Sequence, residues 1–331
     1  MKQIKKILVP TDFSDNAELA YAHAREIAQR FGATVDFVHI VPTMKYFSES
    51  ISMMEAPLDM IDDEIYPTAQ KEAKTKLQDV ISQYSSEDSG GEAIVRVDRK
   101  PSEAIAGLAS EKEYDLIVMP SRGRHKSNFL RGSTTEKVIR YSKVPVFTVD
   151  DKLTSEGLKR IVVPTDGSMV SFAALPLALS LADIYDAAIT FYHVQELYGS
   201  PLDNEIHNPS KSEEANVYEA LIDRLEDYLI NEGLDDVQIA RGEVDFEDQF
   251  LITDGASSHR IDFHTVIGKG VSAHVGIQEF VTDNADVVVM ATHGHSGLAH
   301  FFLGSTTEKV AQSVEKPVLT VKPHEEKLEE K

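Results

Sequence analysis

Two sequence stretches recur in the same order along the chain, and this repeat restricts the fold more than any other feature. KKILVPTDFS at 5–14 matches KRIVVPTDGS at 159–168, and GSTTEKV at 132–138 recurs unchanged at 304–310. The landmarks between them also keep their order, with roughly 18 extra residues in the second copy. We therefore interpret the chain as a tandem duplication of one domain of about 150 residues.

A polar stretch, DDKLTSEGLK at 150–159, separates the two copies and lacks hydrophobic periodicity. The length of 331 residues is long for one domain and suits two. We place the first domain at 1–150 and the second at 157–323, and we interpret 324–331 as a charged, solvated tail.

Each copy alternates short apolar runs with helical patterns. In the first copy the periodicity predicts strands and helices in alternation, with strands at 7–9, 35–40, 93–97, 116–119 and 146–149 and helices around 20–31, 69–84, 102–110 and 133–141. Such alternation is typical of an α/β fold. The sequence thus predicts two tandem doubly wound domains, each an open five-stranded parallel sheet with helices on both faces. Ligands of such sheets bind beyond the carboxyl ends of the strands, which is where the PTD and GST stretches of both copies fall.

The net charge of −22 is concentrated in the second half of the chain. Residues 1–150 carry a net charge of −3, and the remainder carries −19. A field of this sign repels nucleic acid and anionic membranes, so we expect neither as a main partner. A phosphate ligand would need a locally shaped site and a cation to offset its charge.

Cysteine is absent, which excludes disulfides, thiol catalysis and cysteine-ligated metals. The apolar runs are too short to span a membrane, and the first residues lack the apolar stretch and cleavage site of a secretory signal. We expect a cytoplasmic protein.

The repeated GSTTEKV has two interpretations. As a capping box, its Ser hydroxyl would bond the third amide of a helix while the Glu reaches back. As an anion site, its glycine would let a phosphate approach the free amides and the positive end of the helix dipole. We expect a capping box in both copies, and in the second copy an anion site as well.

Three features resemble the universal stress protein family over essentially the whole chain. They are the openings ILVPTDFS and IVVPTDGS, the strand endings VHI and YHV, and the loop that leads from the fourth strand into GST. The resemblance implies a stress-response protein that binds ATP or another adenine nucleotide and acts through a conformational or partner-binding change. The nucleotide-binding branch of the family carries a loop of the form Gly, two residues, Gly, nine residues, Gly-Ser/Thr.

The second copy is similar to this loop. In ATHGHSGLAHFFLGST, nine residues separate Gly294 from Gly304, and Ala291 replaces the first glycine but retains a backbone amide. By resemblance, Asp166 would lie near the ribose and a Mg²⁺ ion, and Val194 would contact the adenine. Gly294, Gly304 and Ser305 would hold the phosphates. Ala291 and Thr306 complete the nucleotide-binding residues that we expect in this copy.

The first copy departs from the loop pattern. In PSRGRHKSNFLRGST only eight residues separate Gly123 from Gly132, and Pro120 stands where the first glycine belongs and has no amide to donate. Basic side chains, Arg124 among them, could hold an anion by a different geometry. We expect a weaker nucleotide or anion site here, at which the positions that match in place are Asp12, Ile40, Gly132 and Ser133.

Other interpretations of these residues stay open. An ATP-hydrolysing or adenylating enzyme could use the same fold, but the chain lacks a Walker glycine–lysine pattern and a Ser/His/Asp constellation at plausible spacing, so we assign no catalytic residue. A scaffold that binds nothing is the plainest alternative. Asp12 and Asp166 could orient their turns rather than contact a ligand. The histidines of the second copy, His259 and His264 among them, lack the metalloprotease spacing, and we assign no metal site.

The last predicted strand of each copy, at 144–149 and 317–321, needs a cover for its edge. Family resemblance implies pairing through this strand, so we expect an intramolecular pseudo-dimer and leave further homodimerisation and the protein partner open. The second copy also contains an acidic insertion at 240–259, whose role the sequence leaves open and whose plainest interpretation is a solvated hairpin.

Overall fold

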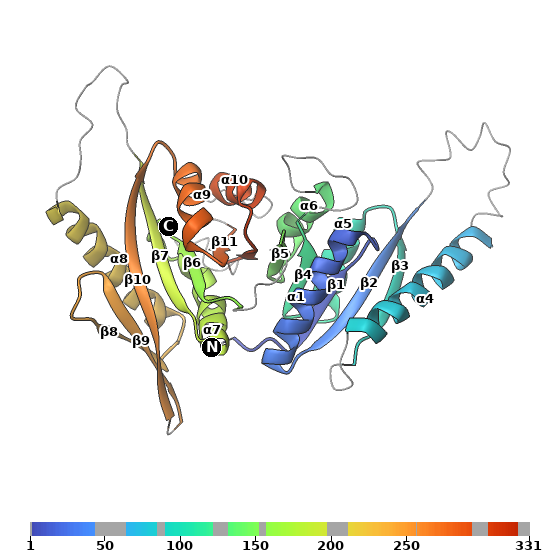
Figure 1. Cartoon of the computed structure of the whole chain (residues 1–331), viewed down its shortest axis with the longest axis horizontal. Helices are drawn as coiled ribbons and strands as arrows, with labels where there is room; N and C mark the ends of the chain where they lie inside the picture. The colour runs from blue at the N-terminus through green and yellow to red at the C-terminus, as the bar shows by residue number, and fades with distance from the viewer. Residues whose placement is uncertain are drawn as a thin grey trace, which may run out of the picture. The chain divides into compact units, whose positions relative to one another are not determined.

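The structure, a computed structural model, describes residues 2–43, 64–84, 90–121, 132–151, 157–196, 211–255, 257–292 and 304–323 (Figure 1). The chain divides into two compact units, Gln3–Leu153 and Thr154–Lys331, the latter together with Met1–Lys2. Each unit contains a parallel sheet built from strands of its own.

The first unit alternates strands and helices as the sequence predicts. Its elements are β1 (Lys6–Pro10), α1 (Asp15–Phe31), β2 (Thr34–Pro42), α4 (Tyr66–Tyr84), β3 (Ala93–Asp98), α5 (Pro101–Glu111), β4 (Leu116–Pro120), α6 (Ser133–Tyr141) and β5 (Val146–Val149). The central strands β1 and β4 are near-continuous apolar runs because both faces of a parallel sheet are buried. Helix α1 ends at Gly32, whose left-handed φ of 67° lets its amide bond the Ala28 carbonyl.

All five strands of the first unit are parallel and follow the order β3-β2-β1-β4-β5. Helices α1 and α4 contact each other, as do α5 and α6, and the two pairs cover the sheet. The direction of winding reverses between β1 and β4, so their carboxyl ends flank the crevice in which doubly wound sheets bind ligands. The predicted α/β fold is confirmed.

The second unit repeats this plan and adds to it. Its elements are β6 (Arg160–Pro164), η4 (Ser171–Ala174), α7 (Leu175–Tyr185), β7 (Ala188–Glu196), α8 (Lys211–Asn231), β8 (Val237–Arg241), β9 (Glu247–Asp254), β10 (Ser257–Gly270), α9 (Ala273–Asn284), β11 (Val287–Ala291), α10 (Ser305–Ser313) and β12 (Val318–Val321). Five parallel strands run in the order β10-β7-β6-β11-β12, which is the order of the first unit.

The sheet of the second unit contains more strands than the five that the sequence predicts. The insertion whose role the sequence left open lies in β8, β9 and the first part of β10, which extend the sheet as an antiparallel ladder. Phe250 and Ile252 of β9 are buried, and the Phe250 ring lies 4.4 Å from that of Phe263. The insertion therefore adds to the core instead of standing in solvent.

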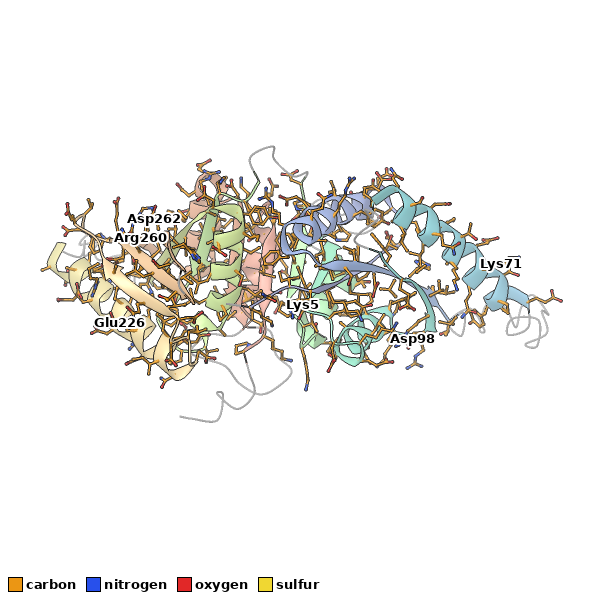
Figure 2. The ribbon with its side chains drawn as sticks, turned by 90° about the horizontal axis from the view of Figure 1, so that it is seen from below. Lys5, Lys71, Asp98, Glu226, Arg260 and Asp262 are labelled. Atoms are coloured by element: carbon orange, nitrogen blue, oxygen red, sulfur yellow. The ribbon has the colours of Figure 1, made fainter. Side chains whose placement is uncertain are left out.

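The exposed face of this ladder is polar. Gln249 on β9 donates to Asp262 at 2.7 Å and accepts from Arg260 at 3.3 Å, and both partners lie on β10 (Figure 2). Ile261 and Phe263, which alternate with them, are buried. This period of two is the pattern of a strand with one solvated face.

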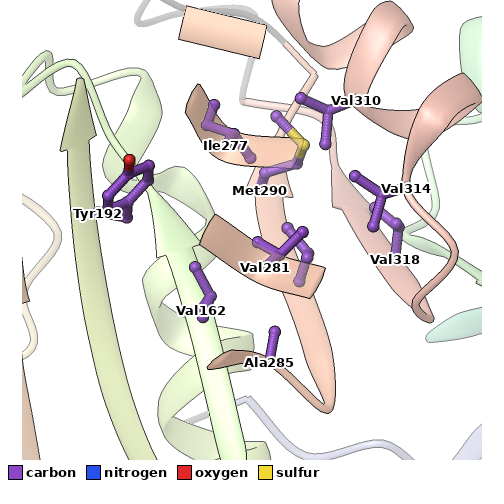
Figure 3. Close-up of a cluster of buried hydrophobic side chains, with 10 residues drawn as sticks. Val162, Tyr192, Ile277, Val281, Ala285, Met290, Val310, Val314 and Val318 are labelled. Carbon is purple, nitrogen blue, oxygen red and sulfur yellow. The ribbon is translucent and has the colours of Figure 1, made fainter. Parts of the chain in front are cut away.

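Helices α9 and α10 cover one face of the second sheet. Ile277 and Val281 of α9 meet Val310 of α10 and Met290 of β11 in a buried cluster (Figure 3). Tyr192 of β7 belongs to the same cluster and stacks on Phe280, with ring centroids 4.1 Å apart. Within the described residues, none of the helices combines the length and the hydropathy needed to cross a membrane.

Candidate functional site

The turns that follow β1 and β6 are built by the same hydrogen bonds. Thr11 Oγ1 accepts the Phe13 amide at 2.9 Å, and Thr165 Oγ1 accepts the Gly167 amide at 3.0 Å. His39 and His193 donate through Nδ1 to the carbonyls of Thr11 and Thr165, at 2.7 and 3.0 Å. Each histidine thus holds the start of a turn to the neighbouring strand.

Asp12 and Asp166 shape these turns. Oδ1 of Asp12 accepts the Ser14 amide at 3.0 Å. Oδ1 of Asp166 accepts both the amide and the hydroxyl of Ser168, at 3.0 and 2.6 Å. The turn-orienting interpretation of the two aspartates is therefore observed, and ligand contact by either aspartate stays a separate proposal.

One position of the turn differs between the copies. Gly167 has φ of 75°, and Phe13, at the same point in the first copy, has φ of 59°. A bulky residue in this region costs about 1–2 kcal/mol. Two contacts of the Phe13 ring offset part of this cost. The ring lies 4.6 Å from the His39 ring, between centroids, and its centroid lies 5.7 Å from the Lys76 ammonium.

In the second copy, helix α8 takes the space that a side chain would need. A Cβ at Gly167 would lie 2.8 Å from Leu221 Cδ2, and Arg224 Nη1 donates to the Gly167 carbonyl at 3.2 Å. Sequence reasoning missed this contact because nothing in the α8 sequence marks Arg224 as a partner of the turn.

The repeated GSTTEKV does not form a capping box. Helices α6 and α10 begin at Ser133 and Ser305, so the N-cap residues are Gly132 and Gly304, which have no side chain to bond an amide. The capping-box prediction is wrong by one helical position. Both glycines adopt extended backbone, with φ of −61° and −58°, so left-handed geometry is not the reason for glycine here.

The second threonine of GSTTEKV has the same structural role in both copies, which gives one reason for the repeated sequence. Thr135 Oγ1 donates to the Pro120 carbonyl at 3.0 Å, and Thr307 Oγ1 donates to the Ala291 carbonyl at 2.8 Å. Both hydroxyls are buried. Each ties the first turn of a helix to the last residue of the strand before it.

The described phosphate-loop residues of the second copy lie together at the carboxyl end of β11. The Gly304 amide donates to the Thr292 carbonyl at 2.8 Å, directly after Ala291. Ser305, Thr306 and Thr307 form the first turn of α10, whose amides have no partner within the helix. This places the positive end of a helix dipole at the strand edge.

Asp166 and Val194 reach the same edge from the two adjoining strands. β6 pairs with both β11 and β7, and Asp166 follows the end of β6. The Val194 side chain packs inward, since a Cβ at Gly276 would lie 3.2 Å from each of its methyl carbons. A ligand at this edge would therefore meet the main chain of Val194.

In the first copy, the equivalent site residues also lie at the carboxyl ends of the strands. The Gly132 amide donates to the Ser121 carbonyl at 2.9 Å, which brings Gly132 and Ser133 to the end of β4. Asp12 follows β1, and the buried Ile40 lies near the end of β2. Three predicted site residues, Gly123, Arg124 and Gly294, lie outside the described residues.

Two histidines of the second copy lie near carboxylates. His259 Nε2 lies 2.7 Å from Asp183 Oδ1, and His264 Nδ1 lies 4.0 Å from Glu247 Oε1. Among the residues that the structure describes, histidines and carboxylates do not gather in groups of three that could hold a metal ion.

Comparisons with known proteins agree with this architecture. The model of the universal stress protein family matches residues 3–150 and again 157–322. A universal stress protein of Mycolicibacterium smegmatis is 23% identical over 321 residues, which cover 96% of this chain and 97% of that protein. Universal stress protein MJ0577 of Methanocaldococcus jannaschii is 28% identical over 156 residues, 45% of this chain and 96% of that protein.

A solved structure supports the tandem fold over its full length. The crystal structure of a universal stress protein from Archaeoglobus fulgidus has a TM-score of 0.61 and 20% identity, and covers 98% of each chain. The family model matches both halves, and together these matches span nearly all of the sequence. The chain belongs to the universal stress protein family and carries two copies of its domain.

Proposed function

We propose that the second copy binds an adenine nucleotide, as ATP with Mg²⁺, at the carboxyl ends of β6, β7 and β11. In this proposal the cytoplasmic protein responds to stress by changing its conformation or its partner when the nucleotide binds. The observation that carries the proposal is the start of α10, where Gly304 holds a helix N-terminus directly beside the last residues of β11.

Helix α10 alone cannot supply the affinity. A charge at a helix end contributes about 0.3–1 kcal/mol, whereas micromolar binding needs about 8 kcal/mol. The remainder would come from contacts across the strand edge, with the phosphates at α10, the ribose and metal near Asp166 and the base near Val194. Mg²⁺ is part of the proposal because this half-chain carries a net charge of −19.

The two copies differ at the loop. Ala291 at the end of β11 keeps an amide, whereas Pro120 at the end of β4 has none. We propose a weaker nucleotide or anion site in the first copy, near Asp12 and the start of α6.

Calorimetric titration of the whole chain with MgATP tests the asymmetry. Gly304→Val should abolish most binding, because the side chain would stand where a phosphate belongs. Gly132→Val is the matched control and should change binding little. Valine can adopt the extended backbone of both glycines, so both variants are expected to fold. Equal losses, or a larger loss from Gly132→Val, would contradict the proposal.

The same preparation separates binding from catalysis. Purified protein should carry adenine nucleotide, and the bound ATP should be recovered unhydrolysed after incubation with Mg²⁺. Rapid turnover would favour the ATP-hydrolysing alternative, and transfer of AMP to an acceptor the adenylating one. Failure of both copies to bind would favour the scaffold.

A further inference from the structure

Strand β7 extends beyond the end of its neighbour β6. The β6 pairing ends at Pro164, opposite Tyr192, whereas β10 follows β7 as far as Glu196. Gln195 therefore lies on an overhang at the carboxyl edge, opposite Lys269 of β10. Because side chains alternate along a strand, Gln195 shares a face with His193, which bonds the Thr165 carbonyl just before Asp166.

The Gln195 carboxamide has an unsatisfied acceptor. Its Oε1 atom is buried and accepts no hydrogen bond from the described part of the chain. Lys269, its neighbour on β10, lies 3.3 Å from the carboxylate of Glu214 on α8. A buried acceptor without a donor is unfavourable and uncommon in folded proteins. A ligand that donates a hydrogen bond to Oε1 would remove this cost.

The first copy has no such group. Val41 occupies the same place on β2, 154 residues earlier, and is buried. β2 also extends beyond β1, alongside β3 as far as Asp98. The overhang is thus common to both copies, and the carboxamide belongs to the second alone.

The position suits one end of a nucleotide. β6 separates β7 from β11, and two strand spacings amount to about 10 Å. A nucleotide with its phosphates at the start of α10 would cross the end of β6 and bring its base to the β7 overhang.

We propose that Gln195 selects the base of the bound nucleotide, an inference that rests on the proposed function. Its Oε1 would accept from the exocyclic amino group of adenine, and its Nε2 would donate to the ring nitrogen N7. A purine with a carbonyl at that position presents two acceptors on this edge, and the carboxamide could donate to only one of them in either orientation. The second copy would therefore prefer 6-aminopurines over 6-oxopurines.

ATP and inosine triphosphate, titrated as Mg²⁺ complexes into the whole chain, form the test. The unsubstituted protein should bind ATP at least tenfold more tightly. Gln195→Val, which installs the residue of the first copy, and Gln195→Met, which keeps the length of the side chain, should each reduce this ratio about tenfold. Val41→Gln is the matched control and should leave the ratio unchanged.

The outcomes separate this inference from the proposed function. Equal affinity of the unsubstituted chain for the two nucleotides overturns the role of Gln195 without any variant. An unchanged ratio in both Gln195 variants, with ATP binding intact, overturns it too while leaving the proposed function in place. Absence of ATP binding by the unsubstituted chain overturns both.

Discussion

His23, on helix α1, is a buried titratable residue. Its ring is 2% exposed, donates through Nε2 to the Asp151 carbonyl at 2.9 Å and packs edge-on against Phe147. Nδ1 is buried and has no partner among the described residues. Burial lowers the pKa of the His23 imidazole below its ordinary 6.5, although the Asp151 carbonyl and the Glu26 carboxylate oppose the shift.

We therefore expect the first unit to lose stability as the pH falls below about 6.5. The unfolded chain takes up a proton on His23 there, and the folded chain takes it up only at lower pH. Between the two pKa values the free energy of unfolding should fall by up to about 1.4 kcal/mol per pH unit. His23→Gln keeps a donor and cannot titrate, so urea unfolding of this variant at pH 5 to 8 should show a shallower slope. Parallel slopes would contradict the assignment.

At the scale of elements, the threonine ties between strand and helix replace the predicted capping boxes. Thr307→Val would leave the buried Ala291 carbonyl without its donor and should cost about 1–3 kcal/mol. Thr135→Val should have the same effect in the first unit, because it removes the donor to the Pro120 carbonyl. Thr134→Val changes an exposed neighbour in α6 and should have little effect. Calorimetric melting of the three variants checks this, and equal melting temperatures for Thr134→Val and Thr135→Val would argue against the tie.

The helices and strands differ in how far the sequence alone could predict them. Strands β1 and β4 and helix α1 were predictable because continuous apolar runs and a terminal glycine are local signals. The N-cap of α10 is Gly304 and not the Ser305 of the expected capping box, because Ser-Thr-Thr-Glu suits either position and the bond from Thr307 to the strand is not local. Strand β9 was missed because Phe250 and Ile252, its buried apolar residues, stand in a short polar stretch that opens with Glu247 and Asp248 and closes with Asp254. The contact of Arg224 with the Gly167 turn left no mark in the sequence.

At the scale of the whole molecule, the two copies share one framework and differ at the carboxyl edges of their sheets. The five parallel strands follow the same order in both units, and the turns after β1 and β6 share their hydrogen bonds. Three differences lie at the carboxyl ends of the strands, where we propose ligand binding: Phe13 against Gly167, Pro120 against Ala291 and Val41 against Gln195. Packing that both copies share constrains the framework residues, whereas these three positions stand at the proposed ligand sites.

Strands β5 and β12 each stand at one end of the strand order of their own unit. In β5 the carbonyls of Pro145 and Val149 accept bonds from β4, so the main chain of Thr148 faces away from β4. In β12 the carbonyls of Pro317 and Val321 accept from β11, so that of Thr320 faces away likewise. We predict that these two outward edges pair with each other within one chain.

A protease site inserted into the polar joint at 152–156 tests this. After cleavage the two halves should elute together at the mass of one chain. Proline removes an amide without disturbing the bonds on the opposite side of the strand, so Thr148→Pro and Thr320→Pro should each make the cleaved halves separate. Thr148→Val keeps the amide and should leave them together. Halves that separate without any substitution, or that stay together in both proline variants, would show that these strands do not join the units.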